Sequence, residues 1–196
     1  MADGQTPDHP FPKDQPFVAA GVLYQHDAYI AQWIANRMNF PLVEVPCVGF
    51  GVMAQGVVPD GPVSKQDFPK LAAAALFWSH QDDKITGMSD IYVTVWADEI
   101  VASHPRIIST ILAFPFGQLK VRRISAEIDA ANDRCIRQCE VLGFQHEGTK
   151  RRMAPGGGDM LLLGLIPEDC PFWPPGKPLD PVQQKRIADI LSRKAA

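Results

Sequence analysis

The chain has 196 residues, of which 46% are hydrophobic, and this length suits one domain with a sizeable core and short extensions. Its net charge of −3 excludes a global basic field that would recruit nucleic acid or an acidic lipid surface. The N-terminus lacks the apolar stretch of a secretory signal, and no apolar run approaches the length of a membrane span.

The four cysteines form no C-x-x-C pair; they are Cys47, Cys135, Cys139 and Cys170. Cys135 and Cys139 share a helix face at i and i+4, but no further His or Cys motif completes a zinc site. We therefore expect buried reduced thiols, no metal, and a reducing cytoplasm.

The first third of the chain predicts a flexible arm, two strands and a helix. Residues 1–16 carry four prolines and few apolar side chains, which is typical of an extended or disordered arm. Phe17–Tyr24 is apolar and strand-like, and Asp27 is placed to cap a helix over Ala28–Met38. A second strand, with two glycines, is predicted over Cys47–Ala54.

The middle of the chain predicts a hairpin followed by a helix. Leu71–Trp78 is a short apolar run, which by itself is ambiguous between helix and strand. We favour a strand, because Ser79–Gly87 resembles a hairpin connection to the alternating strand Asp90–Ala97. A helix over Arg106–Phe114 is predicted to end before Pro115, which cannot continue it.

Residues 122–166 have the clearest pattern in the chain. Apolar and polar residues alternate over Arg122–Asp129, as in a half-buried strand. Asp129 and Asn132 are N-cap candidates for a helix that Gly143 would end. The helix has one apolar stripe, formed by Cys135, Ile136, Cys139 and Leu142.

Two further segments complete this unit and lead to the C-terminus. A segment that begins at Phe144 is turned back at Gly156–Gly158 into the apolar strand Met160–Ile166. We place the domain at residues 17–173, and a proline-rich linker with a last helix at 174–196. Asp180 and Pro181 would open that helix, which is predicted to reach Lys194 with an apolar stripe of Val182, Ile187, Ile190 and Leu191.

The order of these elements resembles that of the GNAT N-acetyltransferases over about residues 17–173. The motifs that carry the resemblance are Asn132 at a helix start, the triplet Leu142-Gly143-Phe144, and Glu147-Gly148 followed by Lys150-Arg151-Arg152. The resemblance implies an α/β (α+β) fold with a mixed, mostly antiparallel, splayed central sheet. Helices would flank both faces, with the C-terminal helix in addition.

Three more features are similar to the small GNAT-like proteins that bacteriophages and prophages encode. They are His26-Asp27 before a helix with Trp33, Phe77-Trp78 at a strand end, and a Phe-Pro-Phe-x-Gln-Leu segment at Phe114–Leu119. This similarity implies a protein of the host bacterial cytoplasm whose acceptor is an amine on a host protein.

The resemblance implies acetyl-CoA as the cosubstrate, with its pantetheine arm paired to strand backbone at Val93 and Val95. The pyrophosphate would lie at the following helix start, where free N–H groups and the helix dipole favour an anion. GNATs usually carry a glycine-rich loop there, whereas this chain has no glycine between Gly87 and Gly117. We expect side-chain donors to replace it, on Ser103, His104 and Arg106.

Each binding candidate has a plainer alternative. Ser103 alternatively caps an ordinary helix, and Asn132 either contacts the pantetheine arm or acts as an N-cap alone. Arg134 and Arg137, on the helix after Asn132, are further cofactor-binding candidates.

The catalytic candidates also follow from the resemblance. Cys139 stands where many GNATs place the tyrosine that protonates the departing CoA thiolate, although core packing is the alternative. No glutamate lies in the strand Asp90–Ala97 to act as a base, so His80, Tyr92 and Asp90 are the candidates. His80 matches base work near neutral pH best, against the alternative of a solvated surface residue. Trp78 and Trp96 either wall the acceptor pocket or pack in the core.

Three functions compete at this stage. The first is an acetyl-CoA-dependent N-acetyltransferase, and the second is a catalytically weak GNAT fold that binds a host protein. The third is a phage nucleic-acid base modifier, against which the acidic net charge counts. A homodimer is left open.

Under the first function, Arg106→Ala should weaken CoA binding by about ten- to a hundredfold, because one charge-assisted hydrogen bond contributes about 1.5–3 kcal/mol. Arg106→Lys keeps the charge without the planar fork, so its affinity for CoA should lie between those of the parent and of Arg106→Ala. Calorimetric titration measures both. Binding within about twofold of the parent would move the phosphate site elsewhere, with Arg122, Arg123, Arg134 and Arg137 as the next candidates.

Overall fold

The computed structural model describes residues 20–22, 27–38, 47–53, 71–83, 85, 88–97 and 105–192. The predicted arm, the binding candidates Ser103 and His104, and the predicted helix end at Lys194 lie outside these residues.

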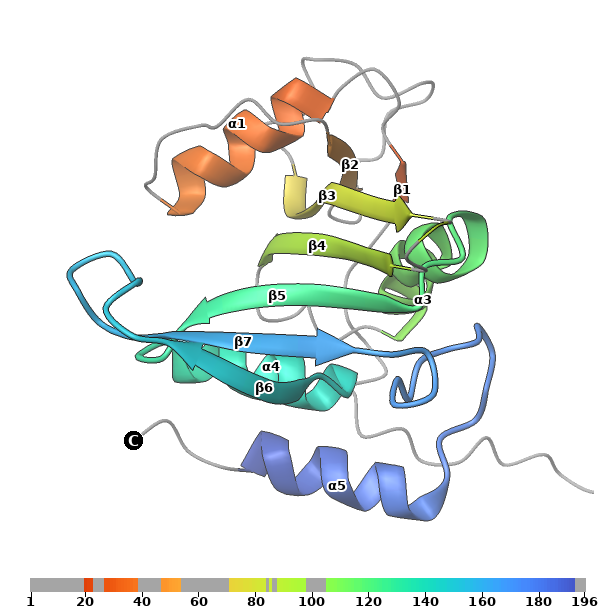
Figure 1. The fold of residues 1–196 in the computed structure, drawn as a ribbon. Helices are drawn as coiled ribbons and strands as arrows, with labels where there is room; N and C mark the ends of the chain where they lie inside the picture. The colour runs from red at the N-terminus through yellow and green to blue at the C-terminus, as the bar shows by residue number, and fades with distance from the viewer. Residues whose placement is uncertain are drawn as a thin grey trace, which may run out of the picture.

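In the described residues, seven strands form one sheet in the order β1-β2-β3-β4-β5-β7-β6 (Figure 1). All neighbouring strands are antiparallel except β4 and β5, which run parallel. This arrangement confirms the predicted mixed, mostly antiparallel sheet. The strands are β1 (Ala20–Val22), β2 (Cys47–Met53), β3 (Leu71–Asp83), β4 (Met88–Ala97), β5 (Arg123–Asp129), β6 (Gln145–Lys150) and β7 (Met160–Leu165).

Helices cover both faces of the sheet, as predicted. On the face that we call the front, α1 (Asp27–Met38) packs Ile30 and Ile34 against Leu71 and Ala74 of β3. The opposite, back face carries the main hydrophobic core. The helices that contribute to it are α3 (Pro105–Leu112), α4 (Asp133–Leu142) and α5 (Pro181–Ser192).

A glycine allows α1 to lie close to the sheet. A Cβ at Gly49 would stand 2.7 Å from the Cβ of Ile30, so a larger residue there would push the helix away. The Gly49 N–H also donates to the Asp27 carboxylate, at 2.7 Å. Asp27, predicted only as a cap for its own helix, therefore also fixes the start of α1 to β2.

β3 continues beyond Trp78 to Asp83, so the predicted hairpin connection over Ser79–Gly87 is too long. The register with β4 shifts between Trp78 and Gln81, and Ser79 has a φ of 51°. A bulge of this kind admits an extra residue while pairing continues beyond it. The polar side chains of this part of β3 lack the apolar alternation from which a strand is predicted.

α3 passes without a break into a π-helical segment, η2 (Ala113–Gln118). The prediction that the helix ends before Pro115 is therefore wrong. The Phe114 ring lies 5.3 Å from that of Phe50 and 5.6 Å from that of Phe77, in the main core. The wider π-helical turn accommodates Pro115, and burial of the aromatic rings stabilises it against the local preference of proline.

Both predicted ends of α4 are confirmed. The Asn132 side chain accepts a hydrogen bond from the Cys135 N–H at 3.1 Å, as an N-cap does. At the other end Gly143 has a φ of 96°, and its N–H reaches the carbonyl oxygens of the last turn. The predicted stripe of Cys135, Ile136, Cys139 and Leu142 packs against the main core.

The segment after β7 belongs to the same core. Phe172, Leu179, Ile187 and Ile190 are buried in it, and the Ser109 hydroxyl donates to the Phe172 carbonyl at 3.0 Å. Val182, predicted in the apolar stripe of the last helix, is instead 78% exposed, because the five positions from it to the buried Ile187 turn its side chain about 140° around the helix. No described helix is both long and apolar enough to cross a membrane.

Gly143 and Gly156, two of the four left-handed glycines among the described residues, allow a test of how the C-terminal segment holds α4. An alanine at either position adopts an unfavourable φ, which costs about 1–2 kcal/mol. A Cβ at Gly143 would also collide with the Asp169 carbonyl. A Cβ at Gly156 would have no atom within 4 Å. Gly143→Ala should therefore lower the free energy of unfolding by about 2–5 kcal/mol. Urea unfolding of both variants measures this, and equal losses would contradict the collision.

Candidate functional site

The site is centred on the point where β4 and β5 separate. The two strands pair at only three positions, and the last of these joins Tyr92 to Ser125. We call this pair the branch point. Beyond it, Val93–Ala97 and Ala126–Asp129 are not paired with each other. These splayed segments leave one edge of each strand without a sheet partner, as the predicted splayed sheet requires.

A polar network lies on the front face beside the branch point. The Ser125 hydroxyl, on a residue only 5% exposed, donates to Asp90 Oδ2 at 2.7 Å. It also accepts from Arg123 Nη2 at 3.0 Å, and Arg123 Nε lies 3.5 Å from Asp90 Oδ1. The group therefore links β4 to β5 where they pair. We call Asp90, Arg123, Ser125 and Glu147 the Ser125 network.

Glu147 extends this network to β6. Its two carboxylate oxygens accept from Arg123 Nη2 at 2.7 Å and Nη1 at 3.2 Å, in a bidentate pair. This hydrogen bond raises the pKa of Arg123 further above its ordinary value, with help from the charges of Asp90 and Glu147. A Cβ at Gly164 of β7 would collide with the Glu147 carboxylate, so the glycine leaves room for the ion pair.

A second ion pair stands next to the first. Lys150 Nζ donates to Glu127 Oε1 at 2.6 Å, and this bond raises the pKa of Lys150. Tyr92 contributes to the raised pKa of both Lys150 and Arg123, so its hydroxyl lies within electrostatic range of two cations.

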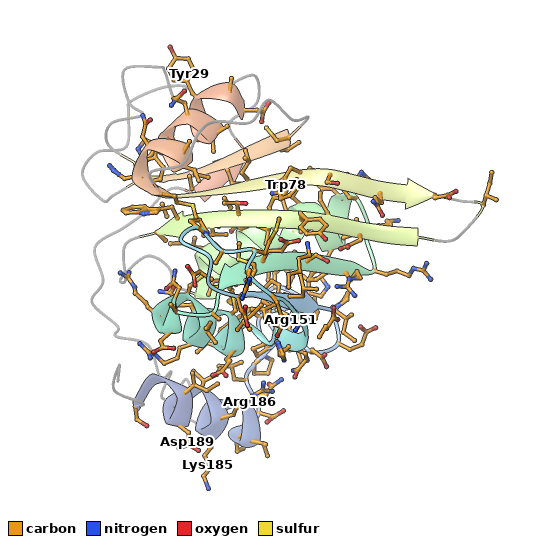
Figure 2. The ribbon with its side chains drawn as sticks, turned by 60° about the vertical axis from the view of Figure 1, so that its left-hand side comes forward. Tyr29, Trp78, Arg151, Lys185, Arg186 and Asp189 are labelled. Atoms are coloured by element: carbon orange, nitrogen blue, oxygen red, sulfur yellow. The ribbon has the colours of Figure 1, made fainter. Side chains whose placement is uncertain are left out.

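Aromatic rings flank the branch point on the side of β3. Trp78, labelled in Figure 2, stacks on Tyr92 with ring centroids 4.9 Å apart, and its Nε1 donates to the Thr94 hydroxyl at 3.1 Å. Farther along β4, Trp96 meets Trp33 of α1 edge to face at 5.2 Å. The Arg37 guanidinium lies over both of these rings, 4.5 Å from Trp33 and 5.0 Å from Trp96.

The cofactor-binding candidates lie at the open end of the splayed segments or outside the described residues. Val93 is partly buried against the main core, and Val95 is 48% exposed. Arg134, in the first turn of α4, reaches the end of β4, where it donates to the Ala97 carbonyl at 3.5 Å. Arg137 is half-buried on the same helix, and Arg106 lies at the start of α3.

Two of the four catalytic candidates share one face of β4, and a third lies on the neighbouring strand β3. Asp90 and Tyr92 share the front side of β4, and His80 is exposed on β3 in the bulge opposite Ile91. Asp90 is engaged with Ser125 and Arg123, which favours a structural role for it. Cys139 lies on the back face with the core, away from the other three.

The Cys139 thiol is engaged with a neighbouring thiol. Its hydrogen bond to Cys135 and its burial raise the pKa of Cys139 well above the ordinary value. The same hydrogen bond lowers the pKa of Cys135. A proton that Cys139 already shares with Cys135 is less available to a departing thiolate.

Sequence reasoning did not find Ser125 and Glu147. Ser125 stands among alternating strand residues, where a lone hydroxyl carries no signal, and Glu147 appeared only as part of a family motif. The one available hint was the position of Ser125 on a predicted strand, where a polar residue stands between apolar ones. Among the described residues, no three His, Cys, Asp or Glu side chains gather as a metal site.

No protein-family model matches the sequence, and no curated protein matches it. Solved structures match in fold. NAA60 of Arabidopsis thaliana, solved in complex with acetyl-CoA, is 13% identical with a TM-score of 0.52, covering 76% of this chain and 98% of that one. The spermidine/spermine N-acetyltransferase SpeG of Vibrio cholerae is 12% identical with a TM-score of 0.52, and the match covers 76% of this chain and 93% of that one. At these identities the likeness establishes the fold, which is the predicted GNAT fold.

The cysteine pair predicts a distinctive pattern of alkylation. Because the thiolate is the reactive form, the lowered pKa of Cys135 should let iodoacetamide modify it at lower pH than a free cysteine. Cys139→Ala removes the thiol that donates to Cys135, so the pH midpoint for alkylation of Cys135 should rise. Cys170, whose pKa burial raises to about 11, should stay unmodified in the folded chain and serves as the control. Mass spectrometry of pulse-labelled protein measures this, and an unchanged midpoint would contradict the hydrogen bond.

Proposed function

We propose that this protein is an N-acetyltransferase that moves the acetyl group of acetyl-CoA to an amine. The observation that carries the proposal is the branch point, because it ends the pairing of β4 and β5 and leaves two strand edges facing each other. The fold that the chain shares with NAA60 and SpeG supports the same class of reaction.

The free strand edges suit the pantetheine arm. Its amides resemble a peptide backbone, and an extended chain with amides binds an open strand edge by hydrogen bonds of the sheet type. Val93 and Val95 on β4 and the facing residues of β5 would supply these groups. Asn132, Arg134 and Arg137 at the start of α4, together with Arg106 at the start of α3, would hold the polar parts of the cosubstrate.

The acceptor amine would approach from the front face. Trp78, Tyr92 and Thr94 lie there on one side of the branch point, and Glu127 with Lys150 on the other. His80 at the bulge is the proposed base, since it is exposed and its imidazole nitrogen can accept a proton from the amine. The similarity to phage and prophage proteins further suggests an amine on a bacterial host protein, in the host cytoplasm.

A second candidate function is a GNAT fold that binds a host protein with little catalysis. The specific observation in its favour is Cys139, which stands on the back face with its thiol bonded to Cys135 rather than offering a tyrosine hydroxyl. Binding of acetyl-CoA without turnover would favour this candidate.

Acetyl-CoA should bind and stabilise the fold. At a hundred times its dissociation constant it should add about 2.7 kcal/mol to the free energy of unfolding, and raise the thermal midpoint by about 5–10 °C. Calorimetry and a thermal scan measure this. ADP is the control, since it has the phosphates without the pantetheine arm, and it should bind far more weakly. No heat and no shift at millimolar acetyl-CoA would refute the proposed function.

A further inference from the structure

Tyr92 has the best-placed hydroxyl at the branch point. An extended arm that enters between the splayed segments must stop where the strands pair, so its reactive end lies beside Tyr92 and Ser125. In the proposed function, that end is the thioester of acetyl-CoA. The side chains of both residues lie on the front face, from which an acceptor would attack.

The other hydroxyls near the branch point are committed to the structure. Ser125 donates to Asp90 and accepts from Arg123, and Thr94 accepts from Trp78 Nε1. In the part of the chain that the structure describes, the Tyr92 hydroxyl has no hydrogen-bond partner. A phenol releases a proton far more readily than the alcohol of serine or threonine.

The surroundings of Tyr92 fit a group that gives up a proton. The ring is stacked on Trp78, whose own orientation is fixed by its bond to Thr94, so the hydroxyl is held in place. Arg123 and Lys150 lie within electrostatic range of it, on β5 and β6. Both cations are also paired with carboxylates, Arg123 with Asp90 and Glu147 and Lys150 with Glu127, so they offer a phenolate close range rather than a free positive charge.

We propose that Tyr92 is the catalytic acid that protonates the departing sulfur of CoA, in place of the helix tyrosine that Cys139 replaces. This inference rests on the proposed function. The amine nitrogen forms a bond to the thioester carbon, the carbon–sulfur bond breaks, and the Tyr92 proton passes to the sulfur. The nitrogen loses its extra proton to the base or water, and the phenolate recovers one from water, so amide and thiol are the products.

Tyr92→Phe tests this assignment, because it keeps the ring on Trp78 and removes only the hydroxyl. The assay follows release of the free CoA thiol from acetyl-CoA, with hydroxylamine as a small nucleophile and the uncatalysed rate subtracted. We expect kcat to fall by about a hundredfold or more, in line with general acid catalysis. The KM and the calorimetric Kd for acetyl-CoA should stay within about twofold of the parent values. The thermal midpoint should change by no more than a few degrees.

Tyr29→Phe is the matched control. Tyr29 lies on α1 and points away from the sheet at the far end of the molecule (Figure 2), and this change should leave kcat unaltered. A kcat for Tyr92→Phe within about threefold of the parent would overturn the assignment. So would a parallel loss of kcat, affinity and thermal midpoint, which indicates a structural role. A parent chain that binds no acetyl-CoA would instead overturn the proposed function itself.

Discussion

The parallel junction of β4 and β5 is the constraint on which the rest of this structure depends. Parallel neighbours need a crossover on one face of the sheet, and here α3 and η2 supply it on the back. Only three residue pairs then hold the strands together. On the back they contribute Ile91 and Ile124 to the core, and on the front the buried Ser125 joins Asp90 to Arg123. One short junction thus serves packing on one face and polar chemistry on the other.

The two faces of the sheet differ in composition for a physical reason. The back is filled by apolar groups from distant segments, among them Phe114 of η2 and Ile187 of α5. Among the described residues, α1 covers the front over the first strands, and β5 and β6 carry charged side chains on that face. Each of the carboxylates Asp90, Glu127 and Glu147 there has a cationic partner. Asp90 Oδ1 and Arg123 Nε are buried without a hydrogen-bond partner, so the Ser125 network is only partly satisfied where β4 and β5 pair.

Local patterns predicted most of the helices and strands, and the resemblance to the GNATs supplied their arrangement in a sheet. The cap at Asn132, the stop at Gly143 and the apolar stripe of α4 are signals that lie within one helix, and all three are confirmed. Predictions failed where packing of distant residues decides the outcome, as at Pro115, which burial of Phe114 holds in a π-helical turn. The Ser125 network is a case of the same kind, because its members come from three strands far apart in the sequence. The Tyr92 hydroxyl was a candidate from the start, but only the register of β4 and β5 places it at the branch point.

The burial of the segment after β7 bears on how the chain acquires its structure during synthesis. Phe172, Leu179, Ile187 and Ile190 complete the same core that β3 and β5 begin. A ribosome delivers the N-terminal strands first, and domains fold as whole units once their parts are available. The core on the back of the sheet, to which α3, η2 and α4 already contribute, therefore stays incomplete until α5 has left the exit tunnel. Nascent chains of this protein should depend on chaperones for the interval between the appearance of β3 and that of α5.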